Sequence, residues 1–367
     1  MVKDTYKVVS ADSHVVEPHD LWQRYAPAEF QDRVPRLVRG ETCDKLVGED
    51  YVGDVGLLAG CLRKDEDVRV EGRWDEDVFP GGYDPHQRVK DLEIDGVQAE
   101  ILFPTIAMAF YPIPDVTFQW ELFKAYNTWL ADFCGEYPMQ LKGIGMLNHE
   151  TVDLAIAEMI RCKELGHVGV MIPLFSGESV GYRDPALDPL WAAAAELELP
   201  VNLHSSTFRD KSKGFFSLTS FTERLLNTPI QIQRTLFELI FSGVFDRHPN
   251  LKVVSTENDA GWAGHMAERG DYWWNRHRKL IVDEVACTQE PSFYLHQNIR
   301  HAFMRDRTAI LSRDVIGIHT LMWGNDFPHH ISTWPHSQDL VEEYRKDLDP
   351  AEHEQLFCSN ARDLYRF

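Results

Sequence analysis

Residues 168–205 contain the pattern that decides the fold of this chain. They begin with a short apolar run, VGVMIP at 168–173, continue through a segment at 185–199, and end with a second run that begins at Val201. Large apolar side chains recur at helical spacing in the middle segment, and Pro200 ends that helix before the next run. The first run does not alternate with polar residues, as expected of a parallel strand that is covered on both faces. The stretch therefore predicts a strand, a helix and a second strand in an α/β fold.

The same alternation recurs along most of the sequence. Short runs rich in apolar and β-branched residues are each followed by a helix-like segment. The predicted strands are residues 7–12, 99–104, 141–147, 167–173, 201–205, 251–257, 298–303 and 320–326. Eight strand–helix units predict a (β/α)₈ barrel.

Residues 21–88 interrupt this rhythm. They are rich in Asp, Glu, Arg, Gly and Pro and show little periodicity. Because they follow the first strand, and loops after barrel strands emerge at the catalytic end, we expect an irregular insertion near the barrel mouth. It would act as a lid or a dimer contact, or it would be a surface subdomain without a chemical role. We interpret residues 1–367 as one barrel domain that carries this insertion.

Charge and composition limit the possible partners. The chain has 37 Lys and Arg against 58 Asp and Glu, a net charge of −21, which argues against electrostatic binding to nucleic acid or to an anionic membrane. With 44% hydrophobic and 11% aromatic residues, it can bury a large core. No apolar run approaches the ~20 residues of a membrane span, and the first residues are too charged for a signal peptide. We therefore expect a cytoplasmic protein whose partners are small molecules and further copies of itself, most simply as a homodimer.

Polar side chains that can bind metals stand where four predicted strands end. Asp12 and His14 lie at the end of the first strand, His204 at the end of the fifth, Glu257 of the sixth and Asp326 of the eighth. Alternate residues of a strand point to the same side, so the first two can share one ion. Each position alone is weak evidence, because Asp often starts a helix and His is often a core residue. Together they predict a metal centre, and mixed imidazole and carboxylate ligands suit zinc, manganese or iron.

Four ordered motifs strengthen this interpretation. They are DSHVVEP at 12–18, the segment 190–204 ending in LPVNLH, MWGNDFPH at 322–329 and NARDLYRF at 360–367. In these motifs the chain resembles the amidohydrolase-2 branch of the amidohydrolase superfamily. The resemblance covers nearly the whole chain outside the insertion. It implies a distorted (β/α)₈ barrel.

The resemblance also implies a set of metal ligands. Carried over residue by residue, they are Asp12, His14, His204 and Asp326. Family members include hydrolases and non-oxidative decarboxylases, such as γ-resorcylate decarboxylase and aminocarboxymuconate semialdehyde decarboxylase. This chain has Asp12 where those decarboxylases have His or Glu, and Glu257 where they have a catalytic His. A carboxylate there can serve as a general base or as a further metal ligand.

The leading hypothesis is a metal-dependent hydrolase or non-oxidative decarboxylase that acts on a small organic acid or amide. One ion, with zinc as first choice and manganese or iron as alternatives, would activate a bound water. Asp326 would act as the base, and Glu257 or His329 would carry the proton to the leaving group.

Two residues are candidates for substrate binding. Trp262, with Trp334 and Phe327, would form an apolar wall, although all three could equally be core residues. Arg209 could hold a substrate carboxylate with two hydrogen bonds, or it could be an ordinary surface arginine.

Two further hypotheses remain open. An oxygenase of this fold would hold two iron or manganese ions, with Glu257 and His329 as ligands of the second. A catalytically silent partner subunit would keep the fold and bind metal for stability only. Metal count separates the first alternative from the leading hypothesis, and turnover separates the second.

Overall fold

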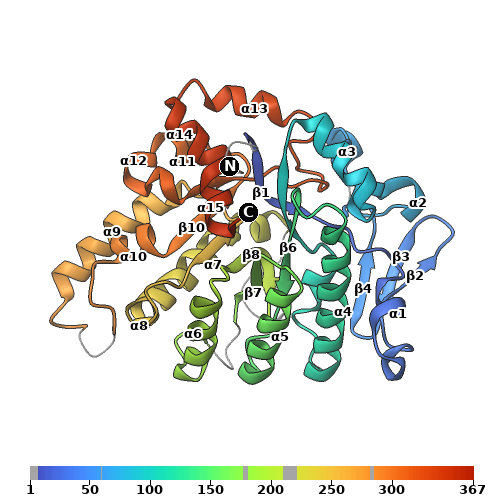
Figure 1. Ribbon diagram of the computed structural model, residues 1–367, viewed down its shortest axis with the longest axis horizontal. Helices are drawn as coiled ribbons and strands as arrows, with labels where there is room; N and C mark the ends of the chain where they lie inside the picture. Colours follow the sequence, from blue (N-terminus) through green and yellow to red (C-terminus); the bar gives the residue numbers. More distant parts are fainter. Residues whose placement is uncertain (1–6, 59, 177–180, 210–220, 282–284) are drawn as a thin grey trace.

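The computed structural model describes residues 7–58, 60–176, 181–209, 221–281 and 285–367, and its centre is a parallel sheet (Figure 1). Within the described residues, eight strands lie side by side in chain order. They are β1 (Val9–His14), β5 (Ala99–Phe103), β6 (Leu141–Met146), β7 (Gly169–Phe175), β8 (Val201–Phe208), β9 (Val253–Thr256), β10 (Ile299–Phe303) and β11 (Leu321–Trp323). The predicted α/β barrel with eight strands is confirmed.

Strand ends differ from the prediction at functionally important places. β1 continues to His14, so both side chains of the Asp12 and His14 pair belong to the strand. β9 ends directly before Glu257 and β11 ends at Trp323, and both Glu257 and Asp326 adopt positive φ values, 57° and 55°. A positive φ is costly for a residue with a side chain, and such residues are frequent at active sites.

The barrel closes through β1 and the chain that follows β11. The Asp326 amide donates to the Asp12 carbonyl at 2.9 Å, and the His14 amide donates to the Phe327 carbonyl at 2.7 Å. These bonds lie beyond the last residue of β11, which makes the closure irregular. They also bring three of the predicted metal ligands to one point.

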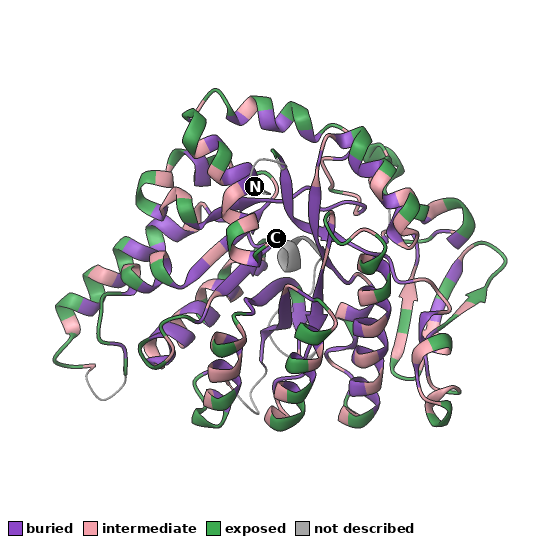
Figure 2. Ribbon diagram, in the orientation of Figure 1, coloured by how far each residue is buried: buried purple, intermediate pink, exposed green. Residues whose placement is uncertain are grey.

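Helices cover the outside of the sheet, and the buried residues concentrate on the strands between them (Figure 2). In α6, Leu190, Trp191 and Ala194 face inward, and Glu198 ends the helix in the left-handed conformation. The helices are α1 (Leu21–Tyr25), α2 (Trp74–Asp77), α3 (Pro85–Asp95), α4 (Val116–Gly135), α5 (Val152–Glu164), α6 (Asp188–Leu197), α7 (Phe221–Phe241), α8 (Val244–Arg247), α9 (Trp262–His277), α10 (Pro291–Gln297), α11 (Arg307–Leu311), α12 (Arg313–Ile316), α13 (Ser337–Tyr344), α14 (Pro350–Glu354) and α15 (Asn360–Tyr365). None of the helices in the described ranges is both long and apolar enough to span a bilayer.

The insertion after β1 contains regular structure that its sequence did not indicate. β2 (Arg36–Arg39), β3 (Asp44–Gly48) and β4 (Tyr51–Asp54) form a small antiparallel sheet beside the barrel (Figure 1). Buried Asp44 organises it by accepting hydrogen bonds from Arg39, Arg73 and the Trp74 amide. Leu46 of β3 is buried in the main core, but the three strands are only four or five residues long, so their hydrophobic pattern is too short to identify a sheet.

The tip of this small sheet reaches the end of the barrel where the strands terminate. The Tyr51 ring packs edge-on against Phe110 with centroids 5.1 Å apart. A cavity of about 160 Å³ lies between Tyr51 and Ser206, which follows His204 by two residues. The insertion therefore contributes to the surroundings of the barrel mouth.

Candidate metal centre

Three elements bring four potential metal ligands together. β1 supplies Asp12 and His14, β8 supplies His204, and the turn after β11 supplies Asp326. His14 Nε2 lies 3.2 Å from His204 Nε2, 3.2 Å from Asp326 Oδ1 and 3.6 Å from Asp12 Oδ1. His204 Nε2 lies 3.5 Å from Asp12 Oδ1. All four side chains are at most 4% exposed.

Hydrogen bonds fix how the two imidazoles are oriented. His14 Nδ1 donates to the Pro104 carbonyl at 2.8 Å, and His204 Nδ1 donates to the Ser205 carbonyl at 3.0 Å. In a neutral imidazole, this leaves the lone pair on Nε2. Two lone pairs therefore face each other across 3.2 Å.

The carboxylates of the cluster also lack partners. Asp12 Oδ1 and Asp326 Oδ2 are buried and have no hydrogen-bond partner within the described chain. Leaving a buried carboxylate oxygen unpaired costs several kcal/mol of stability. A divalent cation at the meeting point of these atoms satisfies both oxygens and both Nε2 lone pairs, so the residues present fit a metal ion.

The pKa values of the clustered side chains are shifted by burial and by their neighbours. Burial, together with nearby His329, lowers the pKa of His14 to about 3, which keeps it neutral as a ligand must be. Burial also raises the pKa of Asp12. Burial alone would lower the pKa of His204, but the Asp12 carboxylate, 3.5 Å from its Nε2, raises it to about 9.

The possible ligand groups meet at a single atom. One is Asp12, His14 and His204, and the other is His14, Asp326 and His329. They share His14, and only its Nε2 is available because Nδ1 bonds to Pro104. Among the described residues, both groups therefore depend on the same ligand atom, His14 Nε2.

Glu257 stands beside this position rather than in it. Its Oε2 lies 3.7 Å from His204 Nδ1, the ring nitrogen that points away from the other ligands. Ser205 Oγ donates to the same oxygen. The side chain is 27% exposed, unlike the four ligands, so it connects the metal position to the barrel mouth. Burial and the charge of Asp326 raise its pKa to about 7.

His329 is held between the metal ligands and the loop after β5. Its Nδ1 lies 3.1 Å from Asp326 Oδ1, its Nε2 lies 3.0 Å from Thr105 Oγ1, and its ring packs 4.0 Å from that of His14. Burial lowers the pKa of His329, but the Asp326 carboxylate outweighs this effect and raises it. The sequence analysis singled out His329 but missed Thr105.

Glu17 is a second residue that the sequence analysis left without a role. It is fully buried, and its carboxylate accepts hydrogen bonds from the amides of Thr105, Ile106 and Ala107. It thereby fixes the loop that carries the partner of His329. The signal was available, because Glu17 is the one charged residue after His14 in the apolar end of the DSHVVEP motif.

The model of the family described as Amidohydrolase (Amidohydro_2) matches residues 84–367. The chain belongs to this amidohydrolase family. Its matched range includes His204, Glu257 and Asp326, whereas Asp12 and His14 precede it.

Relatives of this amidohydrolase include decarboxylases. It is 26% identical over 305 residues to the gamma-resorcylate decarboxylase of Rhizobium sp. (strain MTP-10005), covering 76% of this chain and 86% of the relative. The solved structure of an amidohydrolase from Mycobacterium avium subsp. paratuberculosis K-10 superimposes with a TM-score of 0.79 at 20% identity, over 98% of this chain and 99% of that one. The 5-carboxyvanillate decarboxylase of Novosphingobium aromaticivorans DSM 12444, solved with manganese, gives a TM-score of 0.71 at 17% identity, over 99% and 97%. Both likenesses show the shared fold.

The two predicted substrate-binding residues of the amidohydrolase have other partners in the structure. Arg209 donates from Nε to Glu150 and from Nη1 to the carbonyls of Tyr111 and Ile113, and it is 12% exposed. These bonds tie the end of β8 to neighbouring loops, which favours a structural role over capture of a substrate carboxylate. Trp262 donates from Nε1 to the Asn258 carbonyl and packs edge-on against buried His301 at 5.3 Å. As a residue it is only partly buried.

Phe327 and Trp334, the other proposed wall residues, are buried. Their rings pack 4.9 Å apart, and Trp334 Nε1 donates to the Asp91 carbonyl of α3. They therefore belong to the packing between α3 and the segment after β11, and they leave Trp262 as the aromatic candidate for substrate contact.

Proposed function

We propose that this amidohydrolase is a metal-dependent, non-oxidative decarboxylase of a small aromatic carboxylic acid. The observation that supports the proposal best is the meeting of Asp12, His14, His204 and Asp326 at one buried position, in a chain whose curated relatives include decarboxylases. The gamma-resorcylate and 5-carboxyvanillate decarboxylases both take their names from aromatic acids.

Four residues would hold the cation: Asp12, His14, His204 and Asp326. Zinc, manganese and iron all accept this mixture of imidazole and carboxylate, and manganese occupies the matched 5-carboxyvanillate decarboxylase structure. A divalent cation there supplies positive charge that orients the substrate's oxygen atoms and stabilises negative charge in the transition state.

Glu257 would carry the proton of the reaction. Decarboxylation requires a proton on the carbon that loses its carboxylate. In the proposed step the Glu257 carboxyl gives its proton to that carbon, a C–H bond forms, and the C–C bond to the carboxylate breaks. Carbon dioxide leaves, the electron pair of the broken bond returns to the ring, and Glu257 regains a proton from water. Its partly exposed position beside the ligands, with one oxygen held by Ser205, suits this exchange.

The remaining residues keep the site rigid and dry. Asp326 stays a carboxylate because His14 and His329 lie at 3.2 and 3.1 Å from it. Thr105 holds the far nitrogen of His329. Trp262 would face the aromatic ring of the substrate.

Hydrolysis of a small amide or lactone is the second candidate, and Glu257 is the observation that favours it. A carboxylate at the mouth can take a proton from water as readily as it can give one to carbon. The dinuclear oxygenase receives less support, because the possible ligand groups share His14 Nε2 and describe one ion position. A catalytically silent subunit also receives less support, because a protein without activity would not require Glu257 as a proton carrier beside the four possible metal ligands.

A substrate panel separates these candidates. The protein, purified and loaded with manganese or zinc, is incubated with 2,6-dihydroxybenzoate, 5-carboxyvanillate and related hydroxybenzoates, and in parallel with amides and lactones. We expect stoichiometric release of carbon dioxide from at least one acid, and loss of that activity in His204→Ala. Turnover of amides or lactones alone, or of none of the panel by a fully loaded protein, would contradict the proposal.

A further inference from the structure

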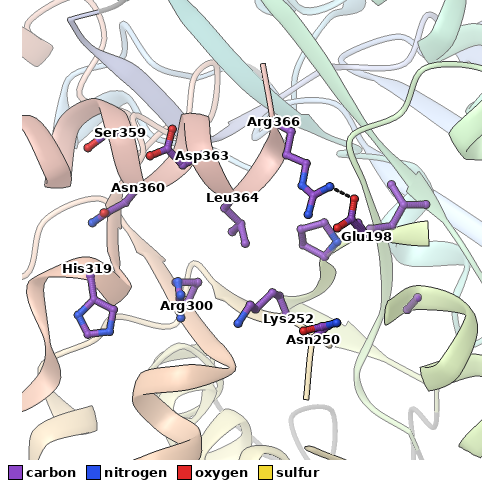
Figure 3. A pocket seen from close by; sticks show the side chains of 13 residues that line it. Glu198, Asn250, Lys252, Arg300, His319, Ser359, Asn360, Asp363, Leu364 and Arg366 are labelled. Atoms are coloured by element: carbon purple, nitrogen blue, oxygen red, sulfur yellow. Dashed lines mark ion pairs between the residues drawn. The ribbon is translucent and has the colours of Figure 1, made fainter. Parts of the chain in front are cut away.

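A second polar pocket lies at the opposite end of the barrel from the metal position. It has a volume of about 440 Å³, and its lining includes Lys252, Arg300 and His319 (Figure 3). Lys252 directly precedes β9, whereas Glu257 directly follows it, so the two ends of this strand reach different sites. At ~3.3 Å per residue they are roughly 16 Å apart.

Lys252 and Arg300 are cationic groups without a carboxylate partner. Within the described parts of the chain, neither forms an ion pair. Lys252 Nζ donates to the Gln297 carbonyl at 2.6 Å, and Arg300 Nη1 donates to the carbonyls of His296 and Ile299 at 3.2 and 2.8 Å. A Lys ammonium has three N–H donors and a guanidinium has five, so most of their donors remain available.

The carboxylates of the pocket do not compensate these charges. Glu198 pairs with Arg366 across one wall, as the dashed line in Figure 3 shows. Asp363 pairs with Arg362 at 3.0 Å. Both acids pair with arginines, and neither forms an ion pair with Lys252 or Arg300, so the positive charges of these two residues remain in the pocket.

The two uncompensated cations also repel each other. Burial, and then the charge of Arg300, lowers the pKa of Lys252, and burial lowers the pKa of Arg300. The pKa of His319 is lowered by burial and by the same two neighbours. In a chain with a net charge of −21, holding like charges together in a partly buried pocket costs stability that a bound anion would restore.

We propose that this pocket binds a small oxyanion with two negative charges, a phosphate or a dicarboxylate, between Lys252 and Arg300. The planar guanidinium of Arg300 presents paired donors that match the spacing of phosphate or carboxylate oxygens. Lys252, directly before the neighbouring strand β9, adds the compact positive charge of its ammonium group. The site is independent of the proposed decarboxylation, because none of its residues contributes to the metal position.

Isothermal titration calorimetry on the metal-loaded protein tests the proposal with two probes, inorganic phosphate and succinate, at constant ionic strength. We expect saturable binding of at least one probe at one site per chain, and the preferred probe identifies the type of oxyanion. Lys252→Met and Arg300→Met should each weaken it about tenfold or more, because each removes a charge-assisted hydrogen bond. Lys163→Met, which removes a charge from the exposed end of α5, should bind like the wild type.

Thermal unfolding shows whether each variant is folded, so that a loss of anion binding can be distinguished from a loss of structure. Without added anion, Lys252→Met should melt at or above the wild-type temperature, since the repulsion is gone, and it should lose the stabilisation that the anion gives the wild type. His204→Ala should keep anion binding although it lacks the metal ligand. Absence of saturable binding of both probes, equal affinities in all the lysine and arginine variants, or loss of binding in His204→Ala would overturn the proposal.

Discussion

Arg88 donates from Nε to Glu100 Oε2 at 2.6 Å, and neither side chain is more than 1% exposed. The same guanidinium donates from Nη1 to the His14 carbonyl at 2.7 Å and lies 4.6 Å above the Phe327 ring. It thus connects α3, at the end of the insertion, to β5 and to both segments that carry the closing metal ligands. This ion pair, which we call the clamp, holds these segments together next to the metal centre but supplies no ligand to it.

Breaking this clamp should be costly. In Glu100→Gln the buried guanidinium loses its counter-charge, and we expect a loss of about 3–5 kcal/mol of unfolding free energy. Urea denaturation measures it. The control is Glu342→Gln, which removes the exposed partner of Arg345 and should cost less than about 1 kcal/mol. Equal losses in the two variants would contradict the role of the clamp.

Removing single ligands should empty the metal centre. His14→Ala and His204→Ala each delete an Nε2 atom and should lose most of the bound metal in elemental analysis of the purified protein. His167 and His248 provide matched controls. His167 is buried but bonded to the Asn127 carbonyl, and His248 pairs with Asp188, so neither lies at the metal position. Full metal content in His14→Ala or His204→Ala would show that the ligands are wrongly assigned.

The barrel could be predicted from the sequence because strands that are buried on both faces appear as continuous apolar runs, and helical segments separate these runs. The sequence also predicted that Asp12, His14, His204 and Asp326 lie close together, because they are polar residues at the ends of such runs. It did not predict β2–β4, which hydrogen bonds around Asp44 organise. Contacts between distant segments, such as that of Arg88 with Glu100, leave no local pattern either.

Among the site residues, too, some contacts could be predicted from the sequence and others could not. Arg209 was a candidate for binding a substrate carboxylate because it follows His204 by five residues, but the fold surrounds its guanidinium with Glu150 and two carbonyls. Conversely, Thr105 follows a strand without any distinguishing pattern, yet it touches His329. Periodicity reports which side of an element is buried, whereas a polar partner from another element becomes visible only in three dimensions.

Acid should destabilise the protein partly through His167. The residue is 3% exposed, and burial lowers its pKa to about 4 from the usual 6.5. Between these values the unfolded chain binds a proton that the folded protein does not, so stability falls as the pH drops from about 6.5 to about 4. The loss is ~3 kcal/mol for this group. Urea denaturation at several pH values should show a shallower dependence in His167→Asn, and identical slopes would contradict the assignment.

Glu257→Gln tests whether Glu257 moves a proton or binds a metal ion. Glu257 lies 3.7 Å from the outward nitrogen of His204 and is held by Ser205, so we expect the variant to keep the metal content of the wild type. Its turnover should fall by roughly 10²–10⁴, because the amide neither gives nor takes a proton. Glu196→Gln, on the exposed side of α6, should change neither quantity. An amide oxygen is a much poorer ligand than a carboxylate, so if Glu257 completed a second metal site, the wild type would hold two ions and Glu257→Gln only one. That result would favour the oxygenase, whereas one ion in both proteins together with lost turnover supports the proton carrier.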